Sequence, residues 1–93
     1  MMLLLMLLAQ PSDAFTRALA RAPAPVRAFV ERRDGCDHWG GEEAYDAARG
    51  REIDAAWRKL RCDRVPADEK LLRRRYARQP AILKLLVPQP EAL

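Results

Sequence analysis

The chain has 93 residues, with 17 Lys and Arg against 13 Asp and Glu and a formal net charge of +4. This length excludes more than one domain and leaves a core so small that such chains often need a disulfide or a metal. Hydrophobic residues make up 49% and charged residues 32% of the chain, a balance that excludes an intrinsically disordered protein. Because β-branched and aromatic residues are scarce, we expect helices.

The N-terminal segment is predicted to be an export signal. Residues 1–9, MMLLLMLLA, form an apolar run that is shorter than the ~20 residues needed to span a bilayer. Its length falls within the ~7–15 residues typical of the apolar part of a signal peptide. Ser12 and Ala14 are small residues placed for cleavage after Ala14, and cleavage after Ala9 or within RALARAPA, residues 17–24, is the alternative. We therefore interpret residues 1–14 as a signal peptide and expect a periplasmic or secreted protein without a transmembrane span. No basic residue precedes the run, and a buried N-terminal helix is the alternative.

The rest of the chain is predicted to form an all-α fold, a small bundle of three to four short helices stapled by one disulfide. Pro25 and Pro66 suit the first turn of a helix, and Gly35 after Asp34 is a typical helix stop. No segment shows the alternation of a strand. We expect a linker over 15–24, a helical domain over 25–87 and a flexible tail over 88–93, with helices over 25–34, 42–61, 66–79 and 80–87.

Apolar spacing predicts which side of each helix meets the core. Val26, Phe29 and Val30 fall at positions i, i+3 and i+4 of the first helix and form one stripe. Gly50 weakens the second helix by about 1 kcal/mol and would let a neighbouring segment approach closely. The residues expected to face the core from the second and third helices are Tyr45, Ala48, Ile53, Ala56, Trp57, Leu60, Leu71, Leu72 and Tyr76.

Cys36 and Cys62 are the two cysteines of the chain and lie 26 positions apart. In an oxidising compartment they are expected to pair. Closing this loop stabilises a folded domain by roughly 3–4 kcal/mol on the chain-entropy model. In a reducing cytosol the same residues would be free thiols, and metal binding would be the leading alternative.

The segment DGCDHWGGEE, residues 34–43, contains the single histidine, one cysteine and four carboxylates. Cys36, His38 and Glu42 could offer sulfur, nitrogen and oxygen to a metal, and this metal-binding module is the alternative function. However, the Cys-x-His spacing is tight, no second pair of ligands supports it, and an oxidised Cys36 cannot ligate. We predict no metal and no cofactor, and interpret the segment as a loop packed against the disulfide.

No catalytic residue is predicted, and the chain is not expected to be an enzyme. A nucleophilic Cys36 would use His38 as its base, but a cysteine in a disulfide is not a nucleophile. Ser12 is the single serine and falls in the predicted signal peptide. Glu42 and Glu43 are adjacent and diverge by about 100° on a helix, so they do not form a matched acid–base pair.

The segment LLRRRYARQP, residues 71–80, is strongly basic. Arginine binds phosphates and carboxylates in a bidentate manner, whereas the alternative interpretation is a solvated face whose arginine stems cover apolar surface. The expected partner is an anionic envelope component or an acidic protein surface. DNA is not expected, and a cytosolic nucleic-acid binder remains the alternative if the N-terminal run is retained. The residues of the predicted anion-binding surface are Arg32, Arg33, Arg73, Arg74, Arg75 and Arg78.

Two stretches of the chain resemble a group of small, exported, uncharacterised proteobacterial proteins. The first is VRAFVERRDGCDHWGGEEAYDAARGREID, residues 26–54, which matches an ERRxxCDHxxGEE-YD core, and the second is LRRRYARQPAILKLL, residues 72–86, which matches an LRRRY C-terminal segment. The resemblance implies an exported, small helical protein and implies no catalytic residues. The Met-Met start without a basic segment departs from the signal peptides of that group. Together these observations predict a non-enzymatic accessory or binding module of the cell envelope.

Overall fold

The computed structural model describes residues 12–88 and confirms an all-α fold with one disulfide. None of the helices in this part of the chain is both long enough and apolar enough to cross a membrane. The helical elements are α2 (Ser12–Ala20), α3 (Ala24–Gly40), α4 (Ala47–Lys59), the 3-10 helix η1 (Cys62–Arg64), α5 (Val65–Arg75) and α6 (Pro80–Leu86).

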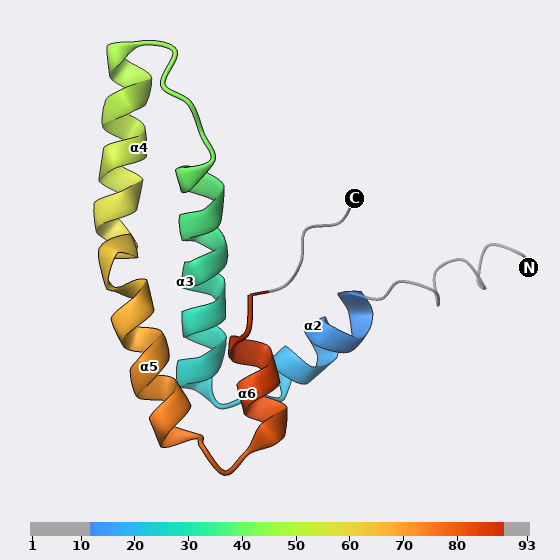
Figure 1. The fold of residues 1–93 in the computed structure, drawn as a ribbon. Coiled ribbons are helices and arrows are strands. Elements are labelled where there is room, and N and C mark those ends of the chain that lie inside the picture. Colours follow the sequence, from blue (N-terminus) through green and yellow to red (C-terminus); the bar gives the residue numbers. More distant parts are fainter. Residues whose placement is uncertain (1–11, 89–93) are drawn as a thin grey trace, which may run out of the picture.

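Helix α3 is the centre of the structure and packs against each of the other helices (Figure 1). The chain leaves the end of α3, rises through residues 41–46, and returns as α4, η1 and α5, which follow one another along one side of α3. Helices α2 and α6 lie together near the beginning of α3. The long helix α3 is thus the surface on which the rest of the chain is assembled.

The hydrophobic core lies around the N-terminal half of α3. The predicted stripe is confirmed, because Val26, Phe29 and Val30 are all buried. Phe15 and Leu19 of α2 pack against this core as partly buried residues. No residue of α4 is buried, so the core does not extend to the far end of α3. The other buried members of the core are Ala22, Tyr76, Ile82, Leu85 and Leu86.

Helix α3 does not stop at Asp34 as predicted, but continues through Gly35 to Gly40. Gly35 has no positive φ, so it is not a helix terminator here. A Cβ built at Gly35 would lie 3.0 Å from Leu60 Cδ1. Gly35 therefore allows the end of α4 to approach α3 closely and does not terminate α3. Residues 36–40, which were predicted to form a loop, are helical.

Helix α4 begins at Ala47 and not near Glu42 as predicted. The reason is a local cap, because the Asp46 side chain accepts a hydrogen bond of 2.8 Å from the backbone N–H of Arg49. Residues 42–46 are therefore not helical and run back along α4. The Cβ of Ala44 lies 3.6 Å from the position that a Cβ on Gly50 would take, as the prediction of a close neighbour at Gly50 requires.

The prediction of a linker over residues 15–24 is wrong for most of that segment, because α2 covers it up to Ala20. Pro23 precedes the first residue of α3 and separates that helix from α2. It does not prevent a separate helix before it, and the apolar side of that helix packs on the core. The cleavage site predicted after Ala14 falls inside α2, whereas residues 1–11 and 89–93 lie outside the described part of the chain.

Of the core-facing residues predicted for the second and third helices, Tyr76 is buried and the others are partly buried or exposed. Tyr45 is 80% exposed and precedes α4, and Trp57 is 39% exposed. Leu71 of α5 is 57% exposed, whereas Tyr76 at the end of that helix is buried as predicted. Apolar spacing did not anticipate that α4 packs against α3 and the adjoining η1 without burying any residue, or that Leu71 faces away from the core.

Candidate anion-binding surface

The predicted disulfide is present between Cys36 of α3 and Cys62 at the start of η1, with their Cα atoms 5.5 Å apart. Both residues are buried. Arg61, directly before Cys62, has the left-handed backbone angles φ 51° and ψ 52°. Such angles are costly for a residue with a Cβ, and here they turn the chain from α4 into η1 beside Cys36. The disulfide therefore joins α3 to the junction between α4 and α5.

The structure does not bring Cys36, His38 and Glu42 together as metal ligands. The sulfur of Cys36 is held in the disulfide, and His38 follows two positions later on the same helix, where side chains point to nearly opposite sides. His38 Nε2 lies 3.5 Å from Glu42 Oε1. Residues 12–88 contain no group of three His, Cys, Asp or Glu side chains arranged to hold a metal.

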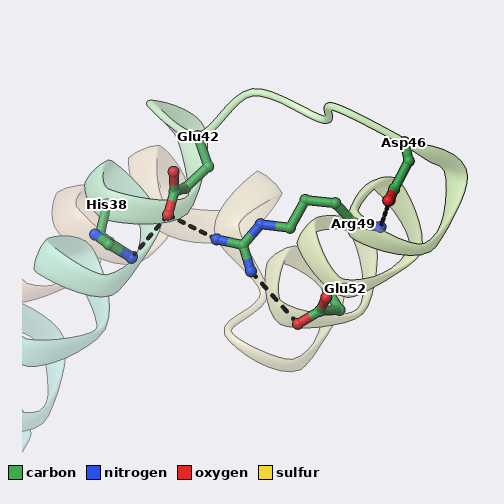
Figure 2. A network of polar contacts seen from close by, with 5 residues as sticks. All are labelled: His38, Glu42, Asp46, Arg49 and Glu52. Atoms are coloured by element: carbon green, nitrogen blue, oxygen red, sulfur yellow. Dashed lines mark hydrogen bonds and ion pairs between the residues drawn. The ribbon is translucent and has the colours of Figure 1, made fainter.

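Glu42 instead belongs to a polar network that joins the end of α3 to α4 (Figure 2). Arg49 donates to Glu42 Oε1 at 2.8 Å, and its other terminal nitrogen lies 3.4 Å from Glu52. The guanidinium of Arg49 also lies 5.1 Å from the centre of the Trp39 ring. These contacts hold the loop against the first turns of α4, which gives Trp39 and Glu42 of the DGCDHWGGEE segment a structural role.

Three of the six arginines predicted to bind anions are engaged inside the protein. Arg33 is buried, 5% exposed, and donates to the backbone oxygen of Leu86, which fixes α6 to α3. Arg32 forms an ion pair of 2.6 Å with Asp68 of α5. Arg73 forms one of 2.9 Å with Glu69, four positions earlier in α5. Because their guanidinium groups already have partners, these residues are poor candidates for an external anion.

The other three arginines, Arg74, Arg75 and Arg78, are exposed and form what we call the arginine edge, at the end of α5 and in the turn that follows. In the described part of the chain the side chains of Arg74 and Arg78 make no hydrogen bond or ion pair, and the guanidinium of Arg75 lies 5.5 Å from the centre of the Tyr76 ring. Residues 70–88 contain no Asp or Glu. Within residues 12–88 no carboxylate forms an ion pair with the arginine edge.

A groove of about 300 Å³ lies between α3 and α5 and was not anticipated from the sequence. Leu71 was expected in the core, so its exposure beside three arginines was missed. The spacing of Leu71, Arg74 and Arg75 at i, i+3 and i+4 is the signal that could have placed them on one face. The residues that line the groove are Pro25, Ala28, Phe29, Arg32, Asp68, Leu71 and Leu72.

No protein-family model, curated protein or solved structure matches the chain. Its function is therefore inferred from the placement of its own residues.

Proposed function

We propose that the chain is an exported, non-enzymatic accessory or binding module of the bacterial cell envelope, which docks an anionic partner through the arginine edge. The observation that carries this proposal is the exposure of Arg74, Arg75 and Arg78 in a stretch without any carboxylate. Guanidinium groups are weakly hydrated and form bidentate bonds with phosphate and carboxylate, so three of them on one edge favour an anion. Membership of the exported group that the sequence resembles is part of the same proposal.

The disulfide supports the exported location. Such bonds persist in the periplasm and outside the cell, whereas the cytosol keeps cysteines reduced. A domain whose α4 has no buried residue depends on this bond more than a domain with a larger core does. The protein would therefore be most stable in an oxidising compartment.

The arginine edge is tested by replacing its charges. In the variant Arg74→Gln/Arg75→Gln/Arg78→Gln, binding to phosphatidylglycerol vesicles and to polyglutamate should fall about tenfold or more. Binding of the wild type should also weaken as salt is raised from low to physiological concentration, because exposed charges are screened. Vesicle co-sedimentation and titration with the polymer measure both effects.

The matched control is Arg51→Gln/Arg58→Gln/Lys59→Gln, which removes the same number of charges from the exposed side of α4. This variant should bind as the wild type does. Equal losses in both triple variants would mean that net charge alone attracts anions, and unchanged binding in the arginine-edge variant would refute the proposed site.

Export is tested by the intact mass of the protein purified from its native host, before and after reduction. We expect a species that has lost its N-terminal segment and that gains about two mass units on reduction, as one disulfide does when it takes up two hydrogens. A full-length species with two free thiols would contradict the proposal and return attention to a cytosolic role.

A further inference from the structure

The groove between α3 and α5 is apolar along both walls. Pro25 and Ala28 of α3 are exposed and Phe29 is buried beneath them, while Leu71 and Leu72 of α5 form the facing wall. The ion pair between Arg32 and Asp68 connects the two helices across the groove. A volume of about 300 Å³ is at the lower end of the range of ligand pockets, so the groove suits a few side chains better than a whole cofactor.

The arginine edge continues directly from this groove. Leu71 is 57% exposed, and Arg74 and Arg75 follow it at i+3 and i+4 on α5. Residues with this spacing are neighbours on one helix face, roughly 5–6 Å apart at their Cβ atoms. The apolar wall and the unneutralised charges therefore form one continuous surface.

We infer that the groove and the arginine edge together bind an acidic amphipathic helix of a partner protein. This inference rests on the proposed function and names the class of its anionic partner. Two neighbouring helices, α3 and α5, offer a linear groove that can receive apolar side chains at i, i+3 and i+4 of a third helix. Asp or Glu beside those positions would meet Arg74 and Arg75.

A protein helix suits this surface better than a membrane does. The apolar surface is concave, and of its aromatic and leucine residues only Leu71 is exposed, since Phe29 is buried and Leu72 is partly buried. A membrane-binding surface instead presents several protruding apolar side chains that enter the lipid. Residues 70–88 contain no carboxylate. The cations in this stretch are Lys70, Arg73, Arg74, Arg75, Arg78 and Lys84.

The test is a selection of displayed random peptides against the full, oxidised chain. The selected peptides should combine Asp or Glu with apolar residues three or four positions apart, and should become helical on binding. Their affinity should fall about tenfold in Leu71→Ser, because burial of one leucine side chain is lost. Tyr45→Ser, which removes an exposed aromatic residue that does not line the groove, should leave the affinity unchanged.

The outcomes separate this inference from the proposed function. If the selected peptides lose affinity in Arg74→Gln/Arg75→Gln/Arg78→Gln but not in Leu71→Ser, the edge binds anions without the groove and the inference is overturned while the proposed function stands. If no acidic peptide is selected and vesicle binding depends on Leu71, the inferred helical partner is wrong and the surface binds a membrane. If the selected peptides bind both variants with the affinity of the wild type, the inference is wrong. If vesicles and polyglutamate also bind the arginine variant as they bind the wild type, the proposed function is wrong as well.

Discussion

At the scale of single residues, Arg33 is the clearest case of a charge used for structure. Its guanidinium lies 5.7 Å from the centre of the Phe29 ring and donates to the last turn of α6 through the Leu86 oxygen. We expect Arg33→Ala to lower the free energy of unfolding by about 2–3 kcal/mol, because a charged hydrogen bond is lost and a buried carbonyl is left unpaired. Urea unfolding measures this loss.

The control for that prediction is Arg74→Ala, an exposed arginine of the same charge. Its free energy of unfolding should stay within about 0.5 kcal/mol of the wild type. Equal effects of the two substitutions would show that Arg33 contributes no more than a surface arginine does, and would argue against the position of α6 on α3.

At the scale of elements, α4 depends on its ends because it has no buried side chain of its own. Asp46→Ala removes the N-cap and should cost about 1 kcal/mol of local stability. Since α4 lies outside the core, this loss should appear as faster amide exchange at Arg49 and Gly50 and not at Val30. Asp54→Ala, in the exposed middle of the same helix, should leave these amides unchanged, and slow exchange at Arg49 in both variants would contradict the cap.

Helix starts could be predicted from the sequence where proline sets them. Helix α5 begins one residue before Pro66 and α6 begins at Pro80, because a fixed φ and a missing N–H suit a first helical turn in any surroundings. Gly35 could not be interpreted in the same way. A glycine favours either a helix end or a close contact, and the choice depends on Leu60, which arrives from another helix.

The same distinction applies to the candidate site. The sequence predicted six anion-binding arginines from their charge alone, but only the fold decides which of them meet Asp68, Glu69 or the Leu86 oxygen. The disulfide was predictable because the chain has two cysteines and a signal-like segment. The groove was not, since it requires the relative placement of α3 and α5.

At the scale of the whole molecule, the core and the disulfide stabilise different regions. The core joins α2, α3, Tyr76 at the end of α5, and α6, whereas the Cys36–Cys62 bond holds α4 and η1 to the far half of α3. In Cys36→Ala/Cys62→Ala we expect a loss of roughly 3–4 kcal/mol in the free energy of unfolding. Amide protection in α4 should nearly vanish, while α6 should keep measurable protection.

Hydrogen exchange with mass spectrometry resolves the two regions. Reducing agent added to the double variant should change the amide protection of neither α4 nor α6. An equal loss of protection in α4 and α6 would contradict this division and would mean that the domain unfolds as a single unit with or without the bond.

The core also sets the order in which a newly made chain can mature. Val26, Phe29 and Val30 share the core with Leu85 and Leu86, which are more than fifty positions further along the chain. Cys36, in contrast, needs only Cys62 to form the disulfide. As the chain emerges from the ribosome or a translocation channel, the cysteines can therefore meet while the apolar face of α3 is still open to other proteins. A chain truncated before Ile82 could still close the disulfide but would lack Ile82, Leu85 and Leu86 of the hydrophobic core, and its exposed apolar surface would make it a natural target for chaperones and proteases.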